Sequence, residues 1–402
     1  MAADAERVYR EVQDYYGKEL TKTKDLKTNA CRTLARPLPA FVREALQCVH
    51  EEVSAKYYGC GLVIPECLEN CWILDLGSGS GRDCYVLSKL VGKNGHVTGV
   101  DMTEAQVEVA KKHVAYHMNK FGYQKPNVSF IHGYMEKLGE AGLKDESYSI
   151  VISNCVVNLS PDKRAVLREA YRVLKEGGEM YFSDVYASHD LPEEIRKHRV
   201  LWGECLAGAL WWKDLYKIAE EVGFWPPRLV TTSRITLANK EVESVVGDCQ
   251  FVSATFRLFK IPKDVLPQQQ EVIYKGGIVG HEKELEFDIN YKFKQGEVVD
   301  VDEETAALLQ NSRFASKFFI HPVRPTSDNS SPGKRKLAKG KRVRGACKWL
   351  YTLTGWHLIL AVGGAVLLQE VREKSTQPKQ QGKTTTLSSK QVPLCHQRYG
   401  GV

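Results

Sequence analysis

The chain has 402 residues, of which 43% are apolar, so it can bury a full core. Its length predicts two domains and an appendage. Its formal net charge of +7 is unevenly distributed, because residues 331–402 carry +12 and the first 330 residues carry −5. An acidic body of this kind excludes a broad nucleic-acid-binding surface. The first six residues contain no apolar targeting core and the eleven cysteines are odd in number, so we expect a cytoplasmic protein with reduced thiols.

Two stretches near the N-terminus carry apolar residues at helical spacing, residues 3–19 and residues 38–56. The second stretch begins after Pro37, a residue favoured at the start of a helix. We expect these stretches to form a helical cap on the main domain.

Between residue 71 and about residue 187, short apolar runs alternate with amphipathic stretches, and residues 228–235 and 251–259 are two further strand-like runs. Alternation of this kind predicts a parallel sheet with helices on both faces. The last run places Phe251, Ser253 and Thr255 on one face, as an edge strand does. The predicted strands are residues 71–76, 97–101, 128–132, 149–153, 179–185, 228–235 and 251–259.

The first of these strands ends in the most informative motif of the chain. Asp75 and Leu76 are followed by three alternating glycines, Gly77, Gly79 and Gly81. Glycines let the backbone approach a ligand, and the helix that follows presents free N–H groups to polar or anionic groups. The dinucleotide fingerprint needs its third glycine where Arg82 stands, so the spacing favours S-adenosylmethionine over NAD or a flavin.

A second carboxylate supports this interpretation. Asp101 ends the next predicted strand, 24 positions after Gly77, where a carboxylate can accept hydrogen bonds from both ribose hydroxyls. The plain alternative is a tight turn at Gly77, with Asp101 capping the helix that begins near Thr103. The motif and the strand order together predict an α/β fold with a Rossmann-like, seven-stranded class I methyltransferase sheet.

The sequence changes character after Lys260, where two prolines and three consecutive glutamines indicate a linker. A small α+β domain is predicted beyond it, from strand signals at 284–289 and 298–301, a turn at 294–296 and a helix at 303–310. The predicted parts of the chain are a helical cap at 1–68, a cofactor-binding domain at 69–260, the small domain at 261–325 and a tail at 326–402.

Five segments carry a resemblance to a known family. They are Tyr57-Tyr58-Gly59-Cys60-Gly61, Asp75 to Arg82, Ser153-Asn154-Cys155-Val156-Val157-Asn158-Leu159, Trp202-Gly203-Glu204-Cys205 and Ser312-Arg313-Phe314. Over about residues 10–325 the chain resembles the vertebrate arsenite methyltransferases. The resemblance implies methyl transfer from S-adenosylmethionine to thiol-bound arsenite, giving mono- and dimethylated arsenicals in arsenic metabolism and detoxification.

The resemblance also implies roles for four cysteines. Cys155 and Cys205 are the expected persistent arsenic ligands, and Cys60 completes a site of three sulfurs. Cys31 and Cys60 are expected to supply the electrons that reduce the pentavalent product, ending as a disulfide that thioredoxin or glutathione resolves. Trivalent arsenic is thiophilic, and three thiolates leave its lone pair free to attack a methyl group without acid–base catalysis.

Further cofactor contacts are implied by the resemblance alone. These contacts are Met102, Met135, Glu136 and Val156. Tyr57 or Tyr58 either faces the sulfonium or packs on the helical cap, and the sequence leaves both readings open. The cysteines expected to be ordinary small buried residues are Cys48, Cys67, Cys71, Cys84 and Cys249.

The tail departs from the family pattern. A basic cluster at 334–348 precedes residues 349–368, which contain no charged side chain. Twenty residues can just cross a bilayer, but the threonines, glycines and histidine in this stretch favour a disordered tail over membrane contact.

Two other functions stay open at the level of the sequence. One is a methyltransferase for a quinone-like or other small organic acceptor, since the glycine turn is shared by many such enzymes. The other is a thiol protein that sequesters arsenite without catalysis.

Overall fold

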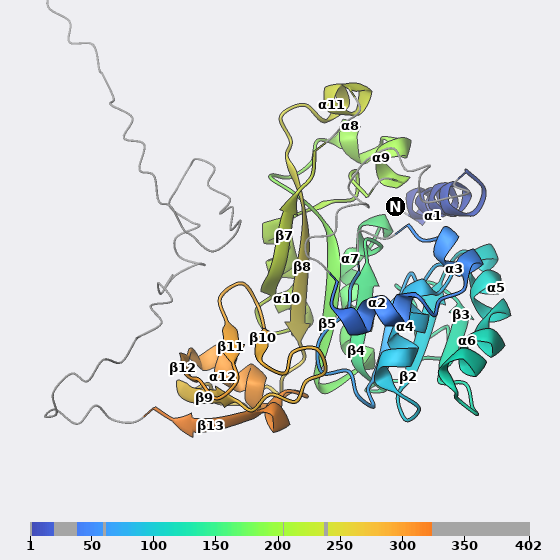
Figure 1. The fold of residues 1–402 in the computed structure, drawn as a ribbon. Helices are drawn as coiled ribbons and strands as arrows, with labels where there is room; N and C mark the ends of the chain where they lie inside the picture. The colour runs from blue at the N-terminus through green and yellow to red at the C-terminus, as the bar shows by residue number, and fades with distance from the viewer. Residues whose placement is uncertain (1, 20–37, 59–61, 204, 237–239, 324–402) are drawn as a thin grey trace, which may run out of the picture. The chain divides into compact units, whose positions relative to one another are not determined.

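The computed structural model describes residues 2–19, 38–58, 62–203, 205–236 and 240–323. Its central sheet contains β1 (Trp72–Leu76), β2 (His96–Asp101), β3 (Val128–His132), β4 (Tyr148–Asn154), β5 (Leu174–Ala187), β6 (Leu210–Trp211), β7 (Arg228–Arg234) and β8 (Phe251–Phe259). The strand order is β3–β2–β1–β4–β5–β8–β7, with β6 paired to β5 (Figure 1). The class I methyltransferase sheet predicted from the sequence is therefore confirmed.

The inner strands are parallel and buried on both faces. In β1, every residue after Trp72 is buried, and Leu74 lies between Thr98 of β2 and Val151 of β4. Parallel strands covered on both sides need apolar side chains in both directions, which explains the nearly continuous apolar run before the glycine turn.

The prediction that residues 251–259 form an edge strand is wrong. β8 pairs antiparallel with β5 on one side and with β7 on the other, so β7 is the edge. The polar residues that suggested an exposed face, Ser253 and Thr255, line a pocket instead. The alternation of polar and apolar side chains along β8 therefore arises because one face of the strand lines a pocket.

Helices cover both faces of the sheet, as predicted. One layer contains α4 (Arg82–Val91), α5 (Glu104–Lys112) and α6 (Val114–Phe121), and the other contains α7 (Lys163–Val173) and α10 (Trp212–Val222). Ile73 of β1 packs into the first layer with Cys84, whereas its neighbour Leu74 packs into the second with Val166 and Leu215. The period of two along β1 thus builds two separate cores.

A third apolar cluster lies at the carboxyl ends of β4 and β5. It joins Val8 and Val12 of α1 (Ala2–Asp14) to Leu201 of α9 (Arg199–Gly203). Cys155 and Cys205 are members of the same cluster. The N-terminal helix therefore packs directly on the part of the molecule that carries the two cysteines.

The N-terminal cap differs from prediction in one place. The first predicted helix is present as α1 followed by a π-helical turn, η1 (Tyr15–Glu19). The second is divided into α2 (Ala40–Leu46) and α3 (Glu51–Ala55). The break has a local cause, because the His50 ring accepts a hydrogen bond from the Glu52 N–H at 3.1 Å and starts a new helix.

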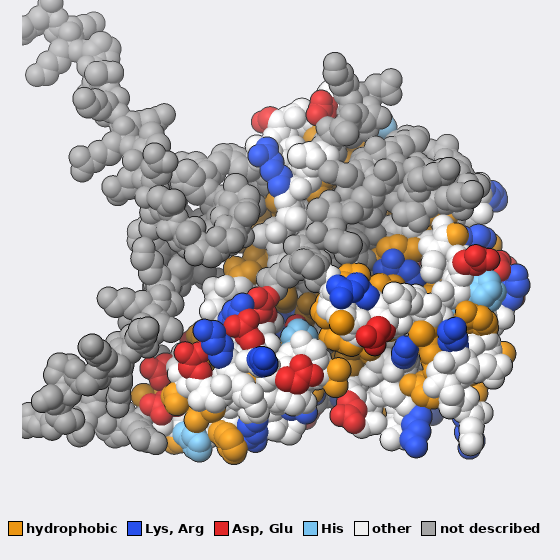
Figure 2. Space-filling model, viewed as in Figure 1, with side chains coloured by type: hydrophobic (Ala, Val, Ile, Leu, Met, Phe, Trp, Pro, Cys, Tyr) orange, Lys and Arg blue, Asp and Glu red, His pale blue; other side chains and the backbone are white. Residues whose placement is uncertain are grey.

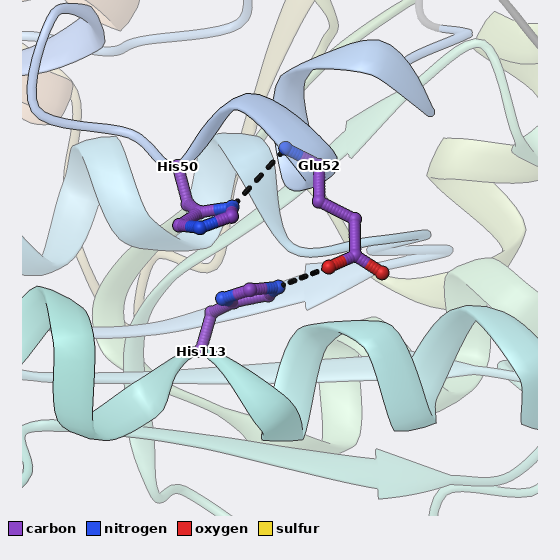
Figure 3. A group of neighbouring side chains, drawn as sticks. All are labelled: His50, Glu52 and His113. Atoms are coloured by element: carbon purple, nitrogen blue, oxygen red, sulfur yellow. Dashed lines mark hydrogen bonds and ion pairs between the residues drawn. The ribbon is translucent and has the colours of Figure 1, made fainter.

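Three side chains hold α3 against the junction of α5 and α6 (Figure 3). His113 Nε2 lies 2.8 Å from Glu52 Oε2, and the His50 and His113 rings stack with centroids 3.8 Å apart. The ring nitrogens of the two histidines and a carboxylate oxygen of Glu52 lie within 4.8 Å of one another, as the ligands of a metal ion would. Stacked rings do not aim their in-plane lone pairs at one point, and Lys112 already pairs with Glu52 at 2.8 Å, so this cluster is best described as a clamp between helices.

The C-terminal part contains two small sheets and one main helix. Its elements are β9 (Gln270–Tyr274), β10 (Glu284–Glu286), β11 (Lys292–Lys294), β12 (Val298–Val301), α12 (Glu303–Gln310), the short 3₁₀ turn η4 (Ala315–Lys317) and β13 (Phe318–Pro322). β9 is the central strand between β12 and β13, and it begins at the last of the three glutamines assigned to a linker. On the face drawn in Figure 2, acidic and basic side chains are interspersed.

The remaining elements are α8 (Glu193–Arg196), α11 (Lys240–Val246) and the 3₁₀ turn η3 (Val157–Leu159). Within the described ranges, no helix has the length and apolar character needed to cross a bilayer. The basic cluster and the uncharged stretch of the tail lie outside the described residues.

A buried ion network ties the central sheet to the C-terminal part. Arg257 of β8 is fully buried and donates to Glu179 of β5 at 3.0 Å, to Glu66 at 2.9 Å and to the Phe287 carbonyl at 2.8 Å. Arg313 also donates to Glu179. Burial opposes ionisation of Glu179, but the two guanidinium groups outweigh it and lower the pKa of this carboxyl. The network joins five segments that are distant in sequence.

Replacing Glu179 by glutamine tests this joint. The substitution leaves two buried guanidinium groups without their shared carboxylate, so we expect the free energy of unfolding to fall by about 3 kcal/mol or more. Urea unfolding followed by tryptophan fluorescence measures the change. The control is Glu108→Gln, which removes an exposed pair with Lys111 at 3.3 Å and should cost less than about 0.5 kcal/mol. Equal losses in the two variants would contradict the proposed joint.

Candidate active site

A pocket opens at the carboxyl ends of β1, β2 and β4, where open α/β sheets bind ligands. All but one of the predicted cofactor residues line it. They are Asp75, Gly77, Gly79, Asp101, Met102, Met135, Glu136 and Val156. The exception is Gly81, which lies beneath the turn as the N-cap of α4.

Each of the three positions in the turn requires glycine for a different physical reason. All have positive φ, at 70° for Gly77, 53° for Gly79 and 85° for Gly81. A Cβ on Gly77 would lie 2.3 Å from Val156, and one on Gly81 would lie 2.7 Å from the Phe130 ring. A Cβ on Gly79 would meet nothing within 4 Å, so this glycine supplies backbone conformation and leaves the pocket wall open.

Asp101 fixes the glycine turn to the end of β2. Its carboxylate accepts from the Gly79 N–H at 2.8 Å and from the Thr103 N–H at 2.8 Å. Burial nevertheless raises the pKa of Asp101. The cap-like contact weighed as an alternative is thus present, and it coexists with a place in the pocket wall.

Asp75 is more deeply buried. Desolvation, followed by the negative charge of Asp83, raises the pKa of the Asp75 carboxyl well above its ordinary value. The Cys84 thiol donates to it at 3.2 Å. Two buried carboxyls with raised pKa values therefore face one pocket, which suits a ligand that carries positive charge.

Sequence reasoning missed several polar residues around this pocket. Asn154 donates to the Tyr57 hydroxyl at 2.6 Å and to Asp83 at 3.0 Å, and the Arg82 guanidinium lies over the Tyr57 ring at 3.1 Å from its centroid. Gln106 also lines the pocket, and its buried Oε1 has no hydrogen-bond partner among the described residues. Asn154 ends a predicted strand at the same sheet edge, which is the signal that could have identified it.

Cys155 follows β4 directly and has a left-handed backbone, with φ of 57°. Its N–H donates to the Ser183 carbonyl at 2.8 Å, which extends the pairing with β5 by one residue before the chain turns into η3. Left-handed φ is unfavourable for a residue with a Cβ, and such conformations concentrate at functional sites. The turn brings Cys155 into the pocket wall.

Cys205 occupies the matching position after α9. The Leu206 N–H donates to the Leu201 carbonyl at 2.8 Å, and the Cys205 N–H donates to the Trp202 carbonyl at 3.0 Å. These two bonds form a Schellman motif, whose left-handed position usually holds glycine. Cys205 takes that position with φ of 61°. Its side chain is fully buried in an apolar cluster.

The two cysteines meet although 50 positions separate them in sequence. The Cys205 Sγ donates to the Cys155 carbonyl at 3.0 Å. Cys155 is disulfide-bonded, and Cys205 carries a thiol. Cys31 and Cys60, predicted as the redox pair and as the third ligand, lie outside the described residues.

Of the other described cysteines, Cys249 belongs to the same apolar cluster as Cys155 and Cys205. Cys71, Cys84 and Cys249 are buried, and Cys48 and Cys67 are partly exposed. A larger cavity of about 770 Å³ borders β5, β7 and β8, but among its lining are none of the predicted site residues. The chemistry is therefore assigned to the smaller pocket beside Cys155.

Comparison with known proteins agrees with this geometry. A methyltransferase domain model matches residues 68–223, and an arsenite methyltransferase C-terminal domain model matches residues 267–343. The chain is 66% identical to the human arsenite methyltransferase, over 82% of this chain and 88% of that protein. The chain belongs to the arsenite methyltransferase family.

A bacterial and an algal relative extend the comparison. The arsenite methyltransferase of Aquipseudomonas alcaligenes is 50% identical over 77% of this chain and 90% of its own length. The crystal structure of an arsenic(III) S-adenosylmethionine methyltransferase from Chlamydomonas reinhardtii has a TM-score of 0.68 and 48% identity, covering 72% of this chain and 97% of that one. Members of this family depend on S-adenosylmethionine.

The strained backbone at Cys205 gives a prediction with an internal control. Both Cys205→Gly and Cys205→Ala remove the sulfur, but only glycine accepts left-handed φ without strain, so we expect Cys205→Gly to be more stable by about 1 kcal/mol. At Cys84, in the first turn of α4, the order of stability should reverse, with alanine more stable than glycine by up to about 1 kcal/mol. Chemical denaturation measures all four variants. The same sign at both positions would refute the left-handed assignment.

Proposed function

We propose that this chain transfers methyl groups from S-adenosylmethionine to arsenite presented as a thiol complex, forming mono- and dimethylated arsenicals in arsenic metabolism and detoxification. The observation that supports it best is the contact between Cys155 and Cys205 beside an acidic pocket of the class I type. Family membership supplies the identity of the acceptor.

The sulfur atoms provide the acceptor site in this proposal. Trivalent arsenic prefers thiolates, and Cys155 and Cys205 present two from adjacent turns, with Cys60 proposed as the third. Each thiol loses a proton when it binds arsenic, so binding releases protons. Three sulfur ligands leave one lone pair on arsenic, and burial of Cys205 keeps water from this side of the site.

The pocket residues fit the proposed methyl donor. S-adenosylmethionine supplies an electrophilic methyl group on a positively charged sulfonium. Asp101 presents a carboxylate that would accept from the ribose hydroxyls, Asp75 presents a buried carboxylate, and Gln106 presents an acceptor that no described protein group satisfies. Met102, Met135, Glu136 and Val156 complete the wall that would hold the cofactor.

In this proposal, methyl transfer to arsenic requires neither a general acid nor a general base. The arsenic lone pair forms the As–C bond while the C–S bond of the sulfonium breaks, and its electron pair stays on sulfur. Arsenic rises formally from the trivalent to the pentavalent state. We propose that Cys31 and Cys60 return two electrons as they form a disulfide, which thioredoxin or glutathione then reduces in the cytoplasm. The disulfide at Cys155 needs the same reduction before arsenic can bind there.

Two other functions explain fewer of the observations. A quinone-like acceptor would use the same glycine turn but gives no reason for Cys155 and Cys205 to meet beside the pocket. A sequestering protein would use the cysteines but gives no reason for buried carboxylates facing the pocket next to them.

Serine substitutions separate the three functions. Under reducing conditions, Cys155→Ser and Cys205→Ser should each weaken arsenite binding by at least about 100-fold and lower methyl transfer by a similar factor, because oxygen is a poor ligand for trivalent arsenic. Cys48→Ser, on the far side of α2, is the matched control and should retain both properties. Tight arsenite binding without turnover in the wild type would favour sequestration, and turnover on an organic acceptor that survives both substitutions would favour the quinone-like alternative.

The raised pKa values of Asp75 and Asp101 predict a pH dependence of cofactor affinity. A bound cation favours the ionised carboxylates and lowers both pKa values, so the free protein holds more protons than the complex. Affinity for S-adenosylmethionine should therefore rise with pH above the ordinary pKa range of an aspartate, until the carboxyls of the free protein have lost their protons. Isothermal titration calorimetry in buffers of different ionisation enthalpy measures both the affinity and the released protons. Asp75→Asn should show a shallower rise, and an unchanged slope would remove Asp75 from the account.

A further inference from the structure

The N-terminal segment contacts the cofactor side of the site through backbone and side chain. The Gln13 side chain donates to the Met102 carbonyl at 2.8 Å, and the Gln106 side chain donates to the Tyr16 carbonyl at 3.3 Å. Met102 and Gln106 line the pocket, and so do Val12 and Tyr16. The end of α1 and the start of η1 therefore form part of the pocket wall.

The same segment contacts the acceptor side. The Tyr16 hydroxyl donates to the Gly203 carbonyl at 2.7 Å. Gly203 is the last residue of α9 and stands two positions before Cys205. A Cβ on Gly203 would lie 2.7 Å from the Tyr15 ring, so glycine there allows the close approach of η1.

The π-helical turn accounts for these simultaneous contacts. A π turn is wider than an α turn and often marks a functional site. Here it places the Tyr15 ring on Gly203 and the Tyr16 ring against the Tyr58 ring, with centroids 5.6 Å apart. Tyr16 consequently holds the cofactor wall through its carbonyl and the Cys205 turn through its hydroxyl.

We propose that Tyr16 is a positioning residue that fixes the Cys205 turn relative to the methyl donor; the inference rests on the proposed function. Direct displacement needs the nucleophile in line with the methyl group, and a displacement of about 1 Å can cost about 100-fold in rate. A bridge of two hydrogen bonds from one residue couples the two sides of the site. It also couples the two binding equilibria, because each ligand orders a wall that the other uses.

The test is Tyr16→Phe in the full chain, which removes one hydroxyl. We expect kcat to fall about tenfold, while the affinity for S-adenosylmethionine measured without arsenite changes less than about twofold. Loss of a single hydrogen bond should lower the melting temperature by no more than about 4 °C. Tyr123→Phe is the matched control, because its hydroxyl donates to the Lys89 carbonyl at 3.3 Å, away from the pocket.

Ligand coupling provides a readout that general destabilisation does not change. In the wild type, bound arsenite should raise the affinity for S-adenosylhomocysteine about fivefold, and in Tyr16→Phe this factor should fall to about one. A retained factor, or retained kcat, in Tyr16→Phe would overturn the positioning role. Failure of the wild type to methylate arsenite would instead reject the proposed function, and the coupling factor would still report on Tyr16.

Discussion

The rest of the site depends on one contact between two turns, in which the Cys205 thiol donates to the Cys155 carbonyl at 3.0 Å. Each turn places its cysteine in the left-handed region, one after a strand and the other at the end of a helix. A left-handed residue with a Cβ costs about 1 kcal/mol, and Cys67, which does not line this pocket, has the same backbone conformation, so it is the meeting of Cys155 and Cys205 beside the pocket that marks these two positions. Both turns lie at the edge of the sheet that also carries the glycine turn.

The scaffold keeps this edge rigid from two directions. Below it, the buried carboxylate of Glu179 and the guanidinium of Arg257 join two strands of the sheet to the C-terminal part. Above it, α1 packs on the cluster that contains both cysteines. Orientation is the main catalytic requirement of a displacement without proton transfer, so a rigid frame around the sulfur atoms has direct chemical value.

The sequence predicted the features that depend on short-range pattern. The glycine turn, the carboxylates Asp75 and Asp101 and the parallel strand order follow from residue types at fixed spacing, and the structure places these side chains in one pocket. The position of β8 inside the sheet could not be read in this way, because Ser253 and Thr255 face a cavity and imitate a solvent-facing edge. The left-handed turn at Cys205 depends on hydrogen bonds that end α9, and the place of α1 depends on tertiary packing. Neither leaves a periodic signal.

X-ray absorption spectroscopy of arsenic bound to the reduced full-length protein tests the central claim most directly. We expect bound arsenic to have three sulfur ligands in the wild type. Cys155→Ser and Cys205→Ser should each remove one of these sulfur ligands. An arsenic shell that stays unchanged in both variants would contradict the account, because the two turns would then hold their cysteines for another reason.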